Sequence, residues 1–328
     1  MLKEKNYAKV LLDKALRIAH GSLFISISKE DKNFLKTLLE EASKKGIKDV
    51  SVHFYDAEAN INEWGKYISK DASFLFIVDD KWNGTLSYRI FNGFRAEEIE
   101  ANFTAALSPN KLFVHQEYNK IFESKDAIIE FNKYISEKKH LIMKLSNFNF
   151  NYLSIQSLKN TDLFMGYQNE YESILKNNHI RVFPNEAIEL LAIPENANGY
   201  IEATRESIVD DVKVEGLRLE IRNGMVIDFD CGTHYQKTKD MLCMKNEPRL
   251  YSVGLVGAST SLYDYDGKDN YILNINSSPF ITIKTKEDER IYVPIASRNL
   301  VITGSNEEIK KKKIYVDEDF EPKIFQRK

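Results

Sequence analysis

The spacing of hydrophobic and polar positions divides the chain into two parts. Up to about residue 145, apolar positions at helical spacing alternate with short apolar runs such as residues 23–28 and 74–78. Apolar stripes with a period of 3.6 residues are typical of amphipathic helices, and short apolar runs between turn residues are typical of buried strands. Their alternation predicts an open, mostly parallel α/β sheet with right-handed crossovers.

Several elements of this first part can be placed by residue number. A serine that caps the start and a glycine that follows the end predict a helix between Ser28 and Gly46. Another helix is expected over residues 5–18, and a helical stretch around residues 127–135. The expected strands are residues 23–28, 49–56, 74–80, 111–115 and 139–145.

Short strand-like segments separated by turns follow from residue 150 onward. Asn223-Gly224 is the strongest hairpin signal, because both residues tolerate the positive φ angles of a tight type I′ turn. We therefore expect an α/β domain over residues 1–148 and a β-rich domain over residues 149–304. Residues 305–328 are highly charged and are expected to form a solvated or partly ordered tail.

Composition and charge narrow the class of protein. The chain has 328 residues, of which 43% are hydrophobic and 29% charged, the size and balance of a two-domain globular protein. Its net charge of −3 excludes a general attraction to nucleic acid. No apolar run approaches the roughly 20 residues of a membrane-spanning helix. Cys231 and Cys243 are the only cysteines and give no disulfide framework, so we expect a cytoplasmic protein. From the net charge and the short apolar runs, we expect neither nucleic-acid nor membrane partners.

Short motifs give no complete catalytic constellation. Cys231 and His234 are three residues apart after an expected strand. They could be a Cys–His nucleophile pair or half of a zinc site, but an ordinary cysteine at a strand end is the commoner explanation. Asp264, Asp266 and Asp269 are similar to the start of a calcium loop without its closing glutamate, which favours a turn.

Two long regions of the chain share their pattern with one protein family. Residues 7–56 follow the order helix, glycine, strand, long helix, glycine, strand, and NTDLFMG (residues 160–166) matches [GN]-T-D-L-x-[VM]-G. Residues 182–230 match a loop that carries a metal-binding glutamate, followed by an E-G-L-x-x-x-F-x-[DN]-G-x-[VI] hairpin. These segments resemble the aminopeptidase T and aminopeptidase S family of two-metal exopeptidases. The resemblance covers most of residues 5–302 and implies an aminopeptidase T-like fold.

The resemblance assigns one metal ligand and leaves the other ligand positions without a counterpart. The family's first metal-binding glutamate falls on Glu186. The second belongs to an L-G-E-[VI] strand, in which Ser252 takes the place of the glutamate. The family's E-N-A-x-x-H and H-x-D segments are missing, since the last histidine of the chain is His234. The candidate cleft comprises Asp162, Glu186, Ser252 and His234.

Two neighbouring divalent ions repel each other, and only several carboxylates and imidazoles can hold them together with the water they activate. We therefore expect that dinuclear peptidase activity has been lost and that the old cleft serves binding or regulation, without a cofactor. The first alternative is a hydrolase or aminopeptidase with a remodelled site, in which Glu186, His234 and an Asp hold one Zn, Mn or Co ion. The second is a structural partner in a complex. The resemblance also implies a homodimer, with a peptide or small molecule as its ligand.

Overall fold

The computed structural model describes residues 2–16, 22–54, 73–79, 102–158, 161–168, 182–183, 187–209, 212–256, 279–286, 290–295, 299–317 and 319–321. The chain divides into two compact units. Unit 1 consists of Met1–Ile135, Ile180–Asn185 and Leu262–Ile272, and unit 2 of Ser136–His179, Glu186–Ser261 and Leu273–Lys328. The chain thus passes between the units several times, whereas the sequence pattern predicted boundaries after residues 148 and 304.

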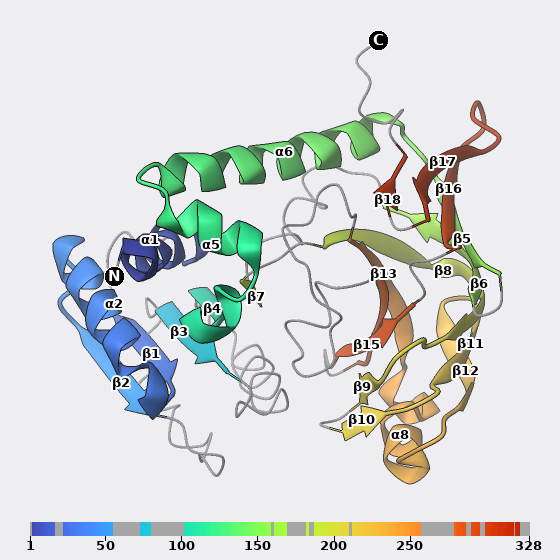
Figure 1. Ribbon diagram of the computed structural model, residues 1–328. Coiled ribbons are helices and arrows are strands. Elements are labelled where there is room, and N and C mark those ends of the chain that lie inside the picture. Colours follow the sequence, from blue (N-terminus) through green and yellow to red (C-terminus); the bar gives the residue numbers. More distant parts are fainter. Residues whose placement is uncertain are drawn as a thin grey trace. The chain divides into compact units, whose positions relative to one another are not determined.

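Unit 1 is built on a parallel sheet with the strand order β2-β1-β3-β4-β7 (Figure 1). All four pairs of neighbouring strands are parallel. The strands are β1 (Leu23–Ile27), β2 (Val50–Phe54), β3 (Ser73–Val78), β4 (Asn102–Leu107) and β7 (Val182–Phe183). Every residue of β1 and β3 is buried, as expected for strands inside a parallel sheet. The predicted open parallel sheet is confirmed.

The helices of unit 1 pack around an aromatic centre. They are α1 (Leu2–Val10), its π-helical continuation (Leu11–Ala15), a 3₁₀ turn (Lys29–Asp31), α2 (Lys32–Lys44), α4 (Pro109–Leu112), α5 (Gln116–Glu123) and the start of α6 (Ala127–Asn147). The Tyr7 hydroxyl donates a hydrogen bond of 2.7 Å to the backbone oxygen of Leu107. Its ring stacks on Phe34 of α2, with 5.4 Å between the ring centroids. Tyr7 therefore ties α1 both to the sheet and to α2.

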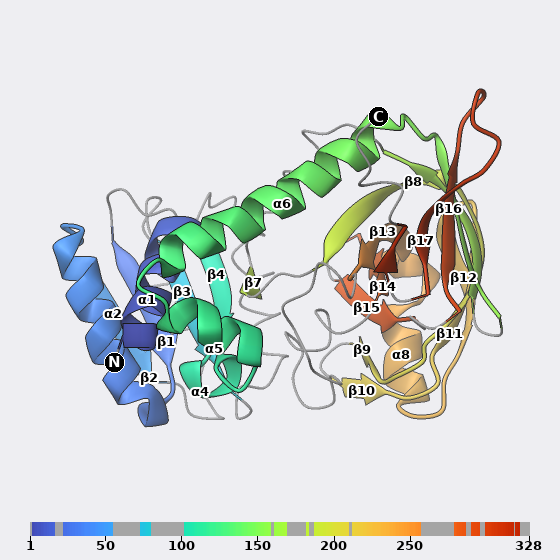
Figure 2. The ribbon, with the colours of Figure 1, turned by 45° about the horizontal axis from the view of Figure 1, so that its top comes forward.

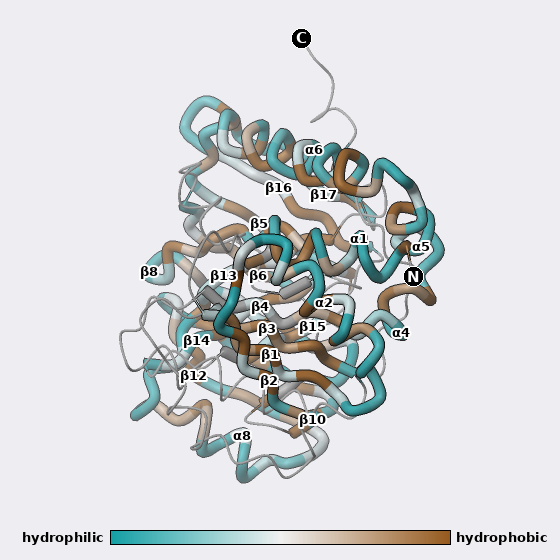
Figure 3. The backbone as a smooth tube through the Cα atoms, turned by 90° about the vertical axis from the view of Figure 1, so that its left-hand side faces the viewer, coloured by the Kyte–Doolittle hydropathy of each residue, from teal (hydrophilic) through white to brown (hydrophobic). Residues whose placement is uncertain are grey.

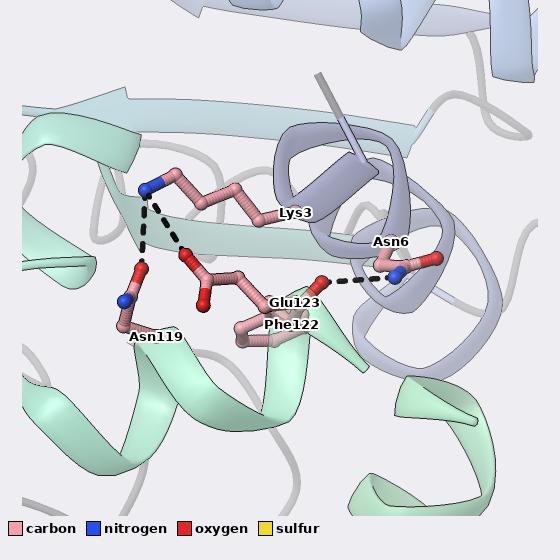
Figure 4. A network of polar contacts seen from close by, with 5 residues as sticks. All are labelled: Lys3, Asn6, Asn119, Phe122 and Glu123. Carbon is pink, nitrogen blue, oxygen red and sulfur yellow. Dashed lines mark hydrogen bonds and ion pairs between the residues drawn. The ribbon is translucent and has the colours of Figure 1, made fainter. Parts of the chain in front are cut away.

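Polar side chains also join α1 to α5 (Figure 4). Nζ of Lys3 donates to Oδ1 of Asn119 over 3.1 Å and lies 3.8 Å from Oε1 of Glu123. Nδ2 of the buried Asn6 donates to the backbone oxygen of Phe122 over 2.9 Å. Because a buried amide without a partner would destabilise the fold, this bond fixes how the two helices lie against each other.

Two expected strands of the first part are helical, so these predictions were wrong. Residues 111–115 lie in α4 and the turn after it, since Pro109 starts a helix and β4 occupies the sheet position. Residues 139–145 belong to α6, which alternates between hydrophilic and hydrophobic turns (Figure 3). A segment of seven residues is too short to distinguish the helical period of about 3.6 residues from the strand period of about 2. No helix in the described ranges is long and apolar enough to cross a membrane.

Unit 2 contains an antiparallel sheet with the strand order β10-β9-β15-β14-β13-β12-β11-β8-β6-β5-β16-β17-β18 (Figure 2). The strands up to β11 are β5 (Tyr152–Ser157), β6 (Thr161–Tyr167), β8 (Ile188–Glu202), β9 (Ser207–Val209), β10 (Val212–Val214) and β11 (Arg218–Arg222). The others are β12 (Met225–Asp230), β13 (Arg249–Leu255), β14 (Phe280–Lys284), β15 (Arg290–Pro294), β16 (Val301–Ser305), β17 (Lys312–Val316) and β18 (Asp319–Phe320). Between β12 and β13 lie the short helix α8 (Tyr235–Met241) and a 3₁₀ turn (Met244–Asn246). The predicted β-rich second part is confirmed.

The long strand β8 organises this sheet. Its C-terminal half pairs with β11 and its N-terminal half with β13, while β6 pairs along its other edge. The inward-facing side chains of β5, β6, β8, β11, β13 and β14 form a single buried hydrophobic cluster. The two ends of β8 therefore have different neighbouring strands, and candidate site residues lie near each end.

The C-terminal segment from residue 305, which was expected to be solvated or partly ordered, contributes two short strands to the sheet. Strands β17 and β18 extend the sheet beyond β16. Ile314, Tyr315 and Phe320 are buried, and the Tyr315 hydroxyl donates to the backbone oxygen of Val256 over 2.8 Å. The burial of these three side chains stabilises the strands, and the neighbouring lysines remain at the surface. The segment therefore joins the sheet despite its high charge.

Candidate functional site

Ser252 lies in the interior of unit 2. It pairs with Leu191 of β8 on one side and with Thr282 of β14 on the other. Both Ser252 and Thr282 are 0% exposed, and neither hydroxyl has a hydrogen-bond partner among the described residues. The serine that the resemblance aligns with a metal-binding glutamate is therefore a buried, uncharged hydroxyl with a second hydroxyl on the neighbouring strand.

Asp162 lies in the other neighbourhood of β8. It is exposed, accepts a hydrogen bond of 3.2 Å from Nε2 of Gln156, and pairs with Tyr200 of β8. Tyr200 and Leu191, the partner of Ser252, are nine residues apart in the same strand (200 − 191). At roughly 3.3 Å per residue, about 30 Å of strand separates the two levels. The sheet does not bring Asp162 and Ser252 together.

His234 follows β12 and precedes α8. It is exposed and has a φ of 53°, in the left-handed region that residues other than glycine seldom adopt. Cys231 is half-buried and carries a free thiol. The backbone of this loop bonds to the segment before β11, since Gly232 donates to the oxygen of Glu215 over 2.8 Å. Glu215 lies just before Arg218, which pairs with Glu202, so this loop lies toward the end of β8 away from Leu191.

Glu186 and the loop with Asp264, Asp266 and Asp269 lie outside the described residues, so the candidate cleft as a whole stays a prediction. Within the described ranges, no three His, Cys, Asp or Glu side chains are grouped so that they could hold a metal ion. The three candidates that are described do not fit a two-ion centre. One is a buried hydroxyl, one is an exposed carboxylate at another level of the sheet, and one is an exposed imidazole in a loop.

The structure adds a charged groove that was not predicted from the sequence. It has a volume of about 560 Å³ and lies over β8, β11 and β12. Its charged and aromatic lining residues are Tyr200, Glu202, Arg218, Glu220, Arg222, Asp228, Phe229 and Asp230. Arg218 and Arg222 each lie 3.0 Å from a carboxylate oxygen, of Glu202 and Glu220 respectively. The bond to Glu202 raises the pKa of Arg218. The charged residues alternate along β11, a pattern that the sequence shows but that also fits any solvated strand.

Comparisons with known proteins identify the fold. Wild-type AmpT from Thermus thermophilus superimposes with a TM-score of 0.68 at 15% sequence identity, covering 97% of this chain and 98% of that one. A 2,5-dihydroxypyridine dioxygenase from Pseudomonas putida KT2440 superimposes with a TM-score of 0.52 at 11% identity, covering 98% and 96% of the two chains. At these identities the likeness concerns the fold alone. No curated protein sequence matches the chain.

A comparison with protein-family models tests whether the chain also belongs to a known sequence family. The model of one family, described as thermophilic metalloprotease (M29), matches residues 96–260. The matched region is half of the chain and includes β5, β6, β8 and the β11–β12 hairpin, in which the aminopeptidase-like motifs were found. The chain therefore belongs to the thermophilic metalloprotease (M29) family.

Proposed function

We propose that this protein binds a peptide or another small ligand without hydrolysing it, as a member of a metallopeptidase family that has lost the dinuclear metal centre. Ser252 carries this proposal. It stands where the family resemblance requires a metal-binding carboxylate, and its buried hydroxyl has no hydrogen-bond partner in the described part of the sheet. A neutral hydroxyl is a poor ligand for a divalent transition-metal ion, so a second ion has no anionic donor at this position.

Without one of the two metal ions, the hydrolysis that the pair of ions catalyses is lost. In two-metal hydrolases, the ions together polarise the scissile bond and lower the pKa of the attacking water. One remaining glutamate cannot replace several ligands, because the charge of two close cations would stay uncompensated. One of the two solved structures with this fold is named a dioxygenase, and that name describes a reaction other than hydrolysis. The fold alone therefore does not specify the chemistry.

A remodelled hydrolase is the second candidate, and family membership favours it. In that case Glu186, His234 and an aspartate would hold one Zn, Mn or Co ion. His234 is exposed and so could reach a ligand from solution. A role as a structural partner in a complex is the third candidate.

The test combines metal content with an activity assay. Protein purified without chelator should contain well under one tightly bound Zn, Mn or Co ion per chain by elemental analysis. With each of these ions added, it should not cleave leucyl or other aminoacyl amides above background, while an active family member serves as positive control. Metal-dependent turnover that disappears in Glu186→Ala would overturn the proposal, and so would two ions per chain. One ion released by His234→Ala would instead support the remodelled hydrolase.

Ligand binding is the positive part of the proposal. Addition of peptides of increasing length should raise the melting temperature of the purified chain, because a ligand that binds only the folded state stabilises it. If no peptide or small polar ligand shifts the melting temperature, the cleft does not serve binding.

A further inference from the structure

The strand order of unit 1 creates a topological switch point within that unit, whereas Ser252 belongs to unit 2. Strand β2, which follows β1 in the chain, lies on one side of β1, and the next strand, β3, lies on the other side (Figure 1). The connections after β1 and β3 consequently leave in opposite directions. In open parallel α/β sheets, ligands bind at the carboxyl ends of the strands at such a switch point.

Two buried carboxylates lie at this switch point. Asp31 follows β1 and is 5% exposed, and Asp79 follows β3 directly and is 8% exposed. The two charges are close enough that Asp79 raises the pKa of the Asp31 carboxyl. Glu4 and Glu30 add to the negative charge around Asp31. Like charges that are buried close together repel each other, and a cation bound between the two carboxylates would relieve this repulsion.

A third chain segment reaches the same edge directly after β4. Nδ2 of Asn110 lies 3.5 Å from Oδ1 of Asp31, and the opposite, oxygen side of this amide is an acceptor. The last pair of the parallel β3–β4 ladder is Val78 and Leu107, so Asp79 and Ser108 are the next pair in register. A backbone bond of 2.8 Å from Ser108 N to Val78 O continues the ladder to this point.

Ser108 gives independent reason to place a ligand here. Side chains of paired residues in neighbouring strands point to the same face of the sheet, so the register places the Ser108 side chain on the same face as that of Asp79. Ser108 is 1% exposed, and its hydroxyl has no hydrogen-bond partner within the described ranges. Buried hydroxyls in proteins are nearly always hydrogen-bonded, so such a hydroxyl at the sheet edge that carries the two buried carboxylates indicates a bound group that supplies the missing partner.

We propose that the carboxyl edge of the parallel sheet binds one hard divalent cation, Mg²⁺ or Ca²⁺, through the carboxylates of Asp31 and Asp79. Such ions prefer oxygen ligands, and Mg²⁺ in particular is held by one or two carboxylates while it keeps several waters. Ser108 and the amide oxygen of Asn110 bind those waters or the ion itself. The cation reduces the repulsion between the two carboxylates and fixes the segments after β1, β3 and β4 relative to one another.

The experiment titrates Mg²⁺ and Ca²⁺ into the full-length protein after removal of metals by a chelator, and follows the heat of binding and the melting temperature. We expect saturable binding of one ion per chain and a rise in melting temperature. Asp31→Asn and Asp79→Asn should each weaken binding by about tenfold or more. Ser108→Ala should weaken it by a smaller factor. Glu30→Gln, which neutralises the exposed acid beside Asp31, is the matched control and should bind nearly as tightly as the unchanged protein.

Two outcomes overturn the inference: no saturable binding of either ion, or binding that is unchanged in both aspartate variants. Should Asp79→Asn fail to fold, Asp31→Asn and Ser108→Ala still decide the matter. Glu186→Ala separates this site from the family's metal site, because it should leave Mg²⁺ and Ca²⁺ binding intact. If binding is lost in Glu186→Ala and kept in Asp31→Asn, the ion belongs to the family's site.

Discussion

Asp31 shows how a single buried side chain makes the protein sensitive to pH. Burial raises its pKa from 3.8 to about 6, and the charges of Asp79, Glu30 and Glu4 act in the same direction. The folded state therefore binds the Asp31 proton more tightly than the unfolded state does. The stabilisation that comes from this proton is complete below about pH 4 and is lost as the pH rises through about 6.

The raised pKa predicts the effect of Asp31→Asn in the metal-free protein. At pH 8, the variant should be more stable than the unchanged chain by about 1–3 kcal/mol, because it no longer buries a charge. The difference should shrink as the pH falls through 6 toward 4. Urea unfolding at several pH values in the presence of a chelator measures the stability difference at pH 8 and its change with pH. Equal stability of the two proteins at pH 8 would contradict the assignment, and Glu30→Gln serves as the exposed control.

At the scale of elements, the β11–β12 hairpin depends on one glycine. Asn223 and Gly224 have φ angles of 48° and 75°, as the type I′ turn predicted from Asn-Gly requires. A Cβ atom on Gly224 would lie 2.1 Å from the backbone oxygen of Pro194 in β8. The turn thus needs glycine for its backbone angles and also for the close approach of β8.

Replacing two glycines separates these requirements. Gly224→Ala should lower the free energy of unfolding by about 2–4 kcal/mol, since it adds a steric clash to an unfavourable φ. Gly46→Ala is the matched control, because Gly46 has a similar φ of 80° and no described atom lies within 4 Å of the added Cβ. It should lower the free energy of unfolding by only about 1 kcal/mol. Chemical denaturation measures the free energy of unfolding of the two variants. Equal decreases would mean that the backbone of β8 shifts at Pro194 to make room for the added Cβ.

The elements that were wrongly expected have a common physical cause. The segments 111–115 and 139–145 are rich in apolar residues and were too short for their period to be read. In α6, Leu141, Ile142 and Leu145 are buried on one face, which becomes visible only over the full length of the helix. In contrast, β5, β6, β11, β12, β14 and β15 were predictable from their strand composition and from the turn residues between them.

At the scale of the whole molecule, the surface of unit 2 bears on assembly. The sheet ends in β10 and β18, with three and two residues respectively, and such short edge strands offer little for pairing with another chain. The face of the sheet offers more. Tyr152 and Phe164 are 38% and 43% exposed and stack on each other, with 5.2 Å between their ring centroids. An exposed aromatic pair is typical of a contact surface.

We predict a homodimer in solution at micromolar concentration that uses this face of unit 2. Light scattering should give a mass near twice 38.0 kDa. Phe164→Asp should return the mass to 38.0 kDa without unfolding the chain, since Phe164 points away from the core. Lys286→Asp, which changes another exposed residue of the same unit, should leave the dimer intact. A mass of 38.0 kDa for the unchanged protein at every concentration would refute the dimer.

The sequence by itself determined the fold class and the family, because both depend on local periodicity, turn residues and motifs that lie close together in the chain. The replacement of a family glutamate by Ser252 was predicted by matching one short strand, and it stays a prediction. The sequence could not show that β17 and β18 join the sheet, because their apolar side chains are scattered among charges.

Only the tertiary structure decided which residues are neighbours. Asp162 and Ser252 belong to the same sheet, yet the register of β8 keeps them at different levels. Asp31, Asp79 and Ser108 are distant in sequence, and parallel strands bring them to one edge. Burial and proximity of charges arise from this packing, and no pattern within a short segment records them. The chemistry of such a site is therefore fixed by strand order, which the sequence specifies only through the whole fold.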